Sequence, residues 1–182
     1  MSYYPSARYL LVEAQEAIHG TKLREFQSSY ANVICEICAA GNKEGQINFD
    51  AGEPLGGQAS PIPYTKNNIV VPMETVDGLV RKHGLDGPFL LKLDTHGFEV
   101  SIFEGAEKTL SDCAILIVEA YNFTLCPGCL RFYELCAYLE ARGFRCLDVY
   151  DVLVRPRDQA LWQMDMVFIS AGAPVFQVAE FR

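Results

Sequence analysis

The stretch Pro88-Phe-Leu-Leu-Lys-Leu-Asp-Thr-His-Gly-Phe-Glu-Val100 decides the fold of this chain. Its first half is an apolar run that predicts a buried strand ending at the acidic Asp94. Apolar residues at helical spacing follow it: Val100, Phe103, Ala106 and Leu110. Gly105 is expected to interrupt that helix, and Cys113–Ala120 predicts a second buried strand, again with an acid, Glu119, near its end. Two strands joined by a helical segment favour a crossover connection and parallel pairing.

The same alternation extends outward in both directions. Further strands are expected at residues 8–12, 32–40, 45–49, 144–150 and 166–170. Helical stripes begin at His19, Val76 and Phe132. The segment 51–68 is rich in Gly, Pro, Ser and Asn, and we expect it to be a functional loop. No helical pattern separates the last two strands, which predicts one antiparallel strand at the sheet edge. The fold class is therefore α/β, with a mostly parallel sheet covered by helices.

Composition limits the class of protein. The chain has 182 residues, half of them apolar, which is enough for a single domain over residues 1–182. Fifteen Lys and Arg against 23 Asp and Glu give a net charge of −8, which argues against nucleic acid or an anionic membrane as a partner. The longest apolar run, Cys113–Val118, is far shorter than the roughly 20 residues of a membrane span. No secretory signal is visible, so we expect a cytoplasmic protein with reduced cysteines.

Three acids end predicted strands, namely Glu13, Asp94 and Glu119. Ligands of open α/β sheets bind beyond the carboxyl ends of the strands, where a carboxylate can accept both hydroxyls of a ribose or hold a substrate. An acid at such a position can equally be solvated or cap the next helix. Three at equivalent positions favour a site without identifying its ligand.

Other signatures are weak or missing. The histidines, which are His19, His83 and His96, show no metal-like spacing, so no metal is expected. Cys126-Pro-Gly-Cys129 has the spacing of a redox or zinc motif, and we expect it to open a helix after a strand. Cysteines tolerated in a loop are the favoured interpretation, and a thiol redox function is the less favoured one.

Read in order, several motifs resemble the FkbM-type methyltransferases, which are S-adenosylmethionine-dependent. The most specific is Leu91-Lys-Leu-Asp-Thr-His-Gly-Phe-Glu-Val100 with Glu104-Gly-Ala106 behind it, similar to the family's K-I-D-x-x-G-x-E and L-x-G-A. Glu74-Thr-Val-Asp77 is similar to a motif that starts a helix before the fourth strand. Leu161-Trp-Gln-Met-Asp165 resembles the tail of some members, so the likeness runs from about Arg8 to Ile169.

The resemblance implies a class I methyltransferase (Rossmann-like) fold with a doubly wound sheet and a bound S-adenosylmethionine. Tyr9-Leu-Leu-Val-Glu-Ala14 is similar to the family's second strand, whose terminal acid, here Glu13, grips the cofactor ribose. The segment from Asn32 to Phe49 is similar to the third strand and the following hairpin. The residues expected to border the adenine are Cys38, Ala39 and Ala40.

Two departures from the family pattern are visible. His96 stands where the family usually has Glu or Gln. The family also begins with a strand and a glycine-rich turn that embraces the methionine part of the cofactor. Only seven residues precede Arg8, against about 30 for a strand and its crossover helix. We therefore expect the usual first strand to be missing from the sheet.

The leading hypothesis is an O-methyltransferase acting on a hydroxyl of a small molecule or sugar. Asp94 is expected to be the general base or to orient the acceptor, with His96 as its competitor and Lys92 as a weaker candidate that can simply pair with an acid. Glu99 and Glu119 are expected to contact the substrate. The alternative is a non-catalytic binding module that keeps the fold without a complete cofactor site. Self-association is compatible with either hypothesis.

Overall fold

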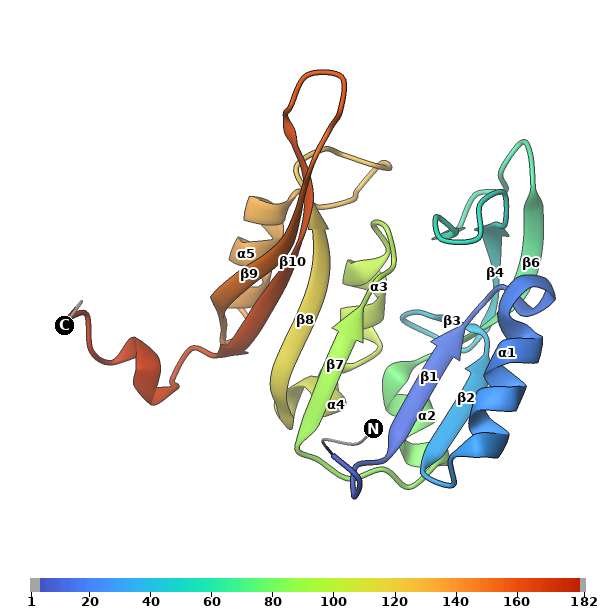
Figure 1. Ribbon diagram of the computed structural model, residues 1–182, viewed down its shortest axis with the longest axis horizontal. Coiled ribbons are helices and arrows are strands. Elements are labelled where there is room, and N and C mark those ends of the chain that lie inside the picture. The colour runs from blue at the N-terminus through green and yellow to red at the C-terminus, as the bar shows by residue number, and fades with distance from the viewer. Residues whose placement is uncertain (1–3, 181–182) are drawn as a thin grey trace. The chain divides into compact units, whose positions relative to one another are not determined.

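The computed structural model describes residues 4–180, along which strands and helices alternate (Figure 1). The chain divides into two compact units. The first contains the described residues up to Leu85 and the segment Ser101–Glu107, and the second contains Asp86–Val100 and the described residues from Lys108 onward. The single domain expected from the sequence stays a prediction.

The first unit opens with a parallel pair of strands. β1 (Tyr9–Glu13) pairs in parallel with β2 (Val33–Ile37), in a register that runs from Tyr9 opposite Val33 to Glu13 opposite Ile37. The helix α1 (Glu16–Ser29) connects the two strands and packs against β2. This is the crossover that the sequence predicts, and it leaves Glu13 at the carboxyl end of β1.

A second, mixed sheet completes the first unit. Its strands, in the order of pairing, are β3 (Ala39–Ala40), β6 (Asn68–Glu74), β4 (Gly45–Asp50) and β5 (Gln58–Ser60). The predicted strand 32–40 is thus divided between two sheets, because β2 ends at Ile37 and Ala39 pairs with β6. β6 was not predicted from the sequence, because a proline inside the run, Pro72, argues against a strand, and β5 was expected to be part of the loop 51–68.

The helix α2 (Val76–Lys82) follows β6 and starts as its sequence predicts. Thr75 is its N-cap, and the Thr75 hydroxyl accepts a hydrogen bond from the Gly78 N–H at 3.0 Å. Gly84, at φ +54°, follows the helix end. The motif Glu74–Asp77 therefore acts as a helix start.

The second unit is one sheet with the order β7-β8-β10-β9. Its strands are β7 (Phe89–Leu93), β8 (Cys113–Tyr121), β9 (Phe144–Val154) and β10 (Leu161–Ser170). β7 and β8 are parallel, and β10 is antiparallel to both β8 and β9. An antiparallel strand is present as predicted, but its predicted place at the edge is wrong, since β10 lies inside the sheet and β9 forms the edge.

Short helices complete the chain. α3 (Glu99–Glu104) begins in the second unit and ends in the first, and α4 (Glu107–Ser111) follows it. Gly105 separates them as predicted, and a Cβ there would lie 2.0 Å from the Gly41 carbonyl oxygen, so only glycine permits this approach. α5 (Phe132–Glu140) packs against β8 and β9, and a 3₁₀ turn, Pro174–Phe176, lies near the end.

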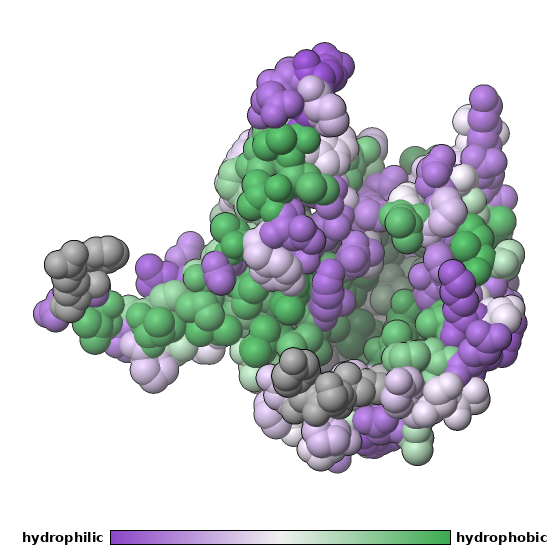
Figure 2. Space-filling view, in the orientation of Figure 1, coloured by the Kyte–Doolittle hydropathy of each residue, from purple (hydrophilic) through white to green (hydrophobic). Residues whose placement is uncertain are grey.

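Burial follows the strand order of the second unit. Leu116 and Val118 of the central strand β8 are fully buried, together with Leu139 of α5 and Phe168 of β10. The edge strand β9 instead exposes apolar side chains, which gather over it in the space-filling view (Figure 2). Among the described residues, no helix combines the length and the apolar character that crossing a membrane requires. The cytoplasmic localisation stays a prediction.

Taken by class, the structure is a mixed α/β fold with several sheets. In the described part of the chain, β1 pairs with β2 alone and β7 with β8 alone. β1 and β7 therefore each have one edge without a hydrogen-bonded strand among the described residues. The doubly wound arrangement and the absence of the usual first strand stay predictions.

Candidate active site

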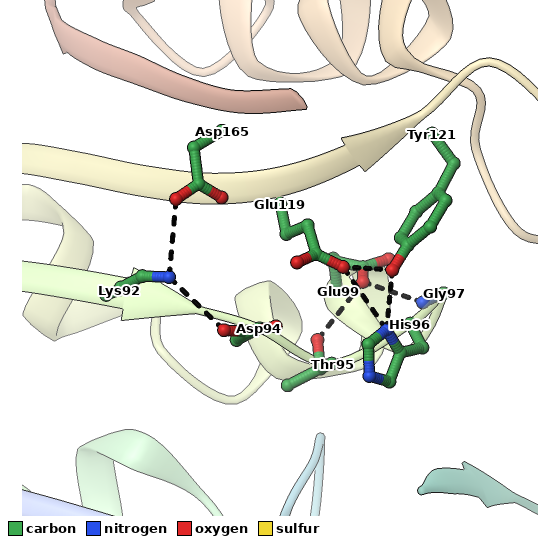
Figure 3. A network of polar contacts seen from close by, with 9 residues as sticks. All are labelled: Lys92, Asp94, Thr95, His96, Gly97, Glu99, Glu119, Tyr121 and Asp165. Atoms are coloured by element: carbon green, nitrogen blue, oxygen red, sulfur yellow. Dashed lines mark hydrogen bonds and ion pairs between the residues drawn. The ribbon is translucent and has the colours of Figure 1, made fainter. Parts of the chain in front are cut away.

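The carboxyl ends of β7 and β8 bring the predicted acids of the second unit together. Leu93 lies opposite Val118 in the parallel register, so the next residues, Asp94 and Glu119, leave the two strands side by side. The predicted catalytic residue His96 lies in the loop after β7 (Figure 3). Parallel pairing therefore explains why residues separated by more than twenty positions share one site.

His96, Tyr121 and Glu119 form a hydrogen-bonded chain (Figure 3). The Tyr121 hydroxyl donates to the Glu119 carboxylate, and the same oxygen lies 2.6 Å from Nδ1 of His96. Because the single phenolic hydrogen is used on Glu119, the Tyr121 oxygen must accept from Nδ1–H of His96. Nδ1 also lies 3.3 Å from Oε1 of Glu119.

The protonation states of this chain follow from burial and contacts. Burial opposes ionisation of Glu119, but hydrogen bonds with His96 and Tyr121 outweigh it and lower the pKa of the carboxyl group. Burial raises the pKa of Tyr121, and the bond to Glu119 raises it further. Glu119 is thus ionised and Tyr121 neutral at pH 7. The side chains of His96 and Glu119 are 19% and 12% exposed, so the charge is only partly solvated.

Lys92 forms a second group with two acids. Its Nζ lies 3.2 Å from Asp94 and 3.5 Å from Asp165 (Figure 3). Burial opposes the charge of Lys92, but Asp94 and Asp165 outweigh it and raise the pKa of the ammonium group. Lys92 is therefore a fixed cation at pH 7, which is the pairing role the sequence analysis held open for it.

Glu99 supports the loop that carries His96. Its carboxylate is buried and accepts hydrogen bonds from the Gly97 N–H at 2.7 Å and from the Thr95 hydroxyl at 3.1 Å. These bonds hold His96 at φ +51° and Gly97 at φ +106°, conformations that most residues avoid. Burial raises the pKa of Glu99. The predicted substrate contact of Glu99 stays a prediction, and the contacts present are those of a loop support.

The predicted cofactor residues all lie in the first unit. Glu13 ends β1, and its Oε1 accepts the Gln15 N–H at 2.7 Å, just before α1. Cys38 and Ala39 are buried and Ala40 is half-buried. Burial raises the pKa of Cys38 to about 11, so its thiol is neutral and adds no charge.

These residues fit a ligand with adjacent hydroxyl groups. The hydrogen bond to Gln15 uses one acceptor position of the Glu13 carboxylate, which offers about four. Gln15 itself carries a buried amide oxygen, Oε1, for which no hydrogen-bond partner occurs among the described residues. A buried acceptor two positions from Glu13 is an unusual cost unless a donor reaches it. The helix-capping role weighed for Glu13 is not present, because the N-cap of α1 is Gln15 and no side chain caps this helix end.

Asp94, His96 and Glu119 each place a ligand atom within 4.8 Å of the others. Two carboxylates and one imidazole are ligand types that divalent cations accept. The same three residues also form hydrogen bonds, Asp94 with Lys92 and both His96 and Glu119 with Tyr121.

Two members of this site, Tyr121 and Asp165, were not predicted from the sequence. Tyr121 follows Glu119 by two positions and therefore points to the same face of β8, a signal that the sequence contains. Asp165 lies directly opposite Glu119 in the antiparallel register of β10. An acid inside the apolar run of β10 was the signal for Asp165.

Acids and an imidazole at the carboxyl ends of parallel strands are typical of α/β enzymes. The family model of the methyltransferase FkbM domain matches residues 3–146, and the chain belongs to this family. The match includes His96, Glu119 and Tyr121, whereas Asp165 lies beyond it. The comparison with curated proteins gave no match. Membership confirms the resemblance seen in the sequence and supports a methyltransferase.

Proposed function

We propose that this protein is an S-adenosylmethionine-dependent methyltransferase that methylates a hydroxyl group of a small molecule. Family membership supports methyl transfer in general. A hydroxyl acceptor is supported by the hydrogen-bonded chain from His96 through Tyr121 to Glu119, because such a chain can remove a proton from an alcohol. When bound, S-adenosylmethionine supplies a methyl group on a positively charged sulfur.

His96 is the general base of this proposal. The hydrogen-bond directions place the imidazole proton on Nδ1, and that neutral tautomer carries its lone pair on Nε2. Nε2 takes the proton of the acceptor hydroxyl as its oxygen attacks the methyl group. The ionised Glu119, 3.3 Å from Nδ1, stabilises the resulting imidazolium. Asp94, which is held by Lys92, orients the acceptor.

Cofactor binding is assigned to the first unit. Glu13 and Gln15 offer acceptors for the ribose hydroxyls, and Cys38, Ala39 and Ala40 offer a small, uncharged surface for the adenine. The doubly wound sheet belongs to the same proposal, supported by two parallel strand pairs, β1 with β2 and β7 with β8, each joined by a helical connection. Family membership favours this enzyme over a non-catalytic module.

The test combines binding and turnover. The full chain is titrated with S-adenosylmethionine by calorimetry and then incubated with methyl-labelled cofactor and a panel of hydroxylated small molecules. His96→Gln should lower kcat about 100-fold and leave the cofactor Kd unchanged. Glu13→Gln keeps an oxygen for the Gln15 N–H but loses the charge, and should raise the Kd about 10-fold, a typical loss for one charge-assisted contact.

His83→Gln is the matched control, because His83 lies in the first unit and is bonded to Glu36. It should change neither kcat nor Kd. Absence of cofactor binding together with absence of transfer would contradict the proposed function. If His96→Gln turned over at the wild-type rate, His96 would not be the general base, but the proposed methyltransferase activity would still hold.

A further inference from the structure

The motif Cys126-Pro-Gly-Cys129 forms a tight turn that joins its two cysteines. Proline in the second position and Gly128 at φ +84° in the third have the pattern of a type II turn. The Cys129 N–H donates to the Cys126 carbonyl oxygen at 3.1 Å, which closes the turn. The Cα atoms lie 5.2 Å apart, and the two sulfurs are joined in a disulfide.

This pairing corrects two expectations from the sequence. The motif does not open a helix, because α5 begins only at Phe132. Reduced thiols are found at the other cysteines, which are Cys35, Cys38, Cys113, Cys136 and Cys146, but not at this pair. A turn of four residues brings its ends close enough for a disulfide, so the spacing alone explains the bond.

The disulfide packs against the backbone of Gly97. A Cβ at Gly97 would lie 2.3 Å from Sγ of Cys129 and 3.0 Å from Sγ of Cys126, so no space remains on that side. Gly97 directly follows His96 and donates its N–H to Glu99. The disulfide is thus one wall of the short loop that fixes the imidazole of His96 in the second unit.

We propose that Cys126 and Cys129 are a reversible redox-modification site for dithiol reductants, whose disulfide form positions the His96 loop. Both cysteines are positioning residues in this account. The geometric basis is the contact with Gly97 together with the unequal exposure of the two cysteine residues. Only the effect on turnover rests on the proposed function, whereas the redox reaction and the change at His96 do not.

Access decides which sulfur reacts. Cys126 is half-buried and is followed by the exposed Pro127 and Gly128, while Cys129 is 7% exposed. A thiolate of the reductant attacks Sγ of Cys126, which forms a mixed disulfide and releases Cys129 as a thiolate. The second reductant thiol then displaces Cys126. Two electrons pass from the reductant to the protein, which gains two thiols after protonation, and the reductant leaves as a disulfide.

Reduction should disturb the His96 loop, because two separate thiols need more room than a disulfide. Bonded sulfurs lie about 2.05 Å apart, and two separate thiols need a larger van der Waals distance. The Gly97 backbone blocks one direction, so either the Cys126–Cys129 turn moves outward or the His96 loop shifts. In both cases Gly97 loses the contact that holds it in place.

The experiment first counts thiols in the full chain. Of the seven cysteines, the two in this disulfide should resist iodoacetamide under denaturing conditions, so mass spectrometry should find five alkyl groups before dithiothreitol and seven after it. Seven groups in protein purified without reductant and oxidised by diamide would overturn the proposal. Cys126→Ser should fix the chain in the thiol form, and Cys136→Ser is the control that keeps the disulfide.

The second measurement follows the three histidine imidazoles by NMR in both redox states. Reduction should shift the resonances of His96, while His19 and His83 in the first unit serve as internal references. Turnover of the reduced protein and of Cys126→Ser should fall at least 5-fold. Unchanged His96 resonances would overturn the positioning role even if turnover is absent, so failure of this proposal is distinct from failure of the proposed function.

Discussion

Glu36 shows how a single carboxylate links pH to stability in the first unit. It lies in β2 and accepts hydrogen bonds from Lys82 at 2.7 Å and His83 at 2.5 Å. Burial opposes its ionisation, but the bonds from Lys82 and His83 outweigh burial and lower its pKa. A carboxyl with a lowered folded pKa stabilises the fold above its unfolded pKa of about 4.3, and that contribution disappears as pH falls through the folded value.

Glu36→Gln should therefore lower the free energy of unfolding by about 1 kcal/mol at pH 7. The loss should shrink progressively below about pH 4, where the wild-type carboxyl becomes protonated as well. Urea denaturation at pH 7 and pH 3 measures both values. Glu25→Gln, on the exposed face of α1, is the control and should cost little at either pH. An equal loss at both pH values would contradict the role of the charge.

At the same scale, the sequence predicted the position of most site residues but not their partners. Asp94, His96 and Glu119 were found because acids and a histidine follow apolar runs. The choice between Asp94 and His96 as base needed the hydrogen-bond directions through Tyr121, which depend on side-chain rotamers. The buried pairing of Asp165 depends on the register of β10 against β8, which the sequence does not encode locally.

At the scale of elements, the N-cap of α2 contributes a measurable amount to the free energy of unfolding. The Thr75 hydroxyl accepts from the Gly78 N–H at 3.0 Å, and Gly78 is buried. Thr75→Ala should lower the free energy of unfolding by about 1 kcal/mol. Thr75→Ser keeps the acceptor and should recover most of that loss in urea denaturation. A serine variant as unstable as the alanine variant would show that the methyl group, not the cap, matters.

Elements with a strong local pattern were predicted and the others were not. The N-terminus of α2, the break at Gly105 and the strands β7 and β8 follow from apolar spacing, a capping residue or glycine. The strand β6 was missed because Pro72 weakens its pattern, while its partner β4 supplies the pairing. The division of 32–40 into β2 and β3 depends on non-local partners, Tyr9–Glu13 and Met73–Glu74, which no local window contains.

At the scale of the molecule, negative charge dominates and extends to the candidate site. The chain carries a net charge of −8. Among the described residues of the candidate site, the carboxyl groups of Asp94, Glu99, Glu119 and Asp165 outnumber the ammonium group of Lys92. A field of this sign repels anionic acceptors, attracts cationic ones and acts little on neutral ones.

The charge of the acceptor should therefore decide its rate. For a matched pair, a polyol and its phosphate ester, kcat/KM should favour the uncharged compound by about 10-fold at low ionic strength. The ratio should fall toward one near 1 M salt, where the Debye length is about 3 Å. Asp165→Asn should lower the ratio at low salt because it removes one of the four acids, whereas Glu25→Gln in the first unit should not. A preference for the phosphate ester, or a ratio independent of salt, would contradict this electrostatic account.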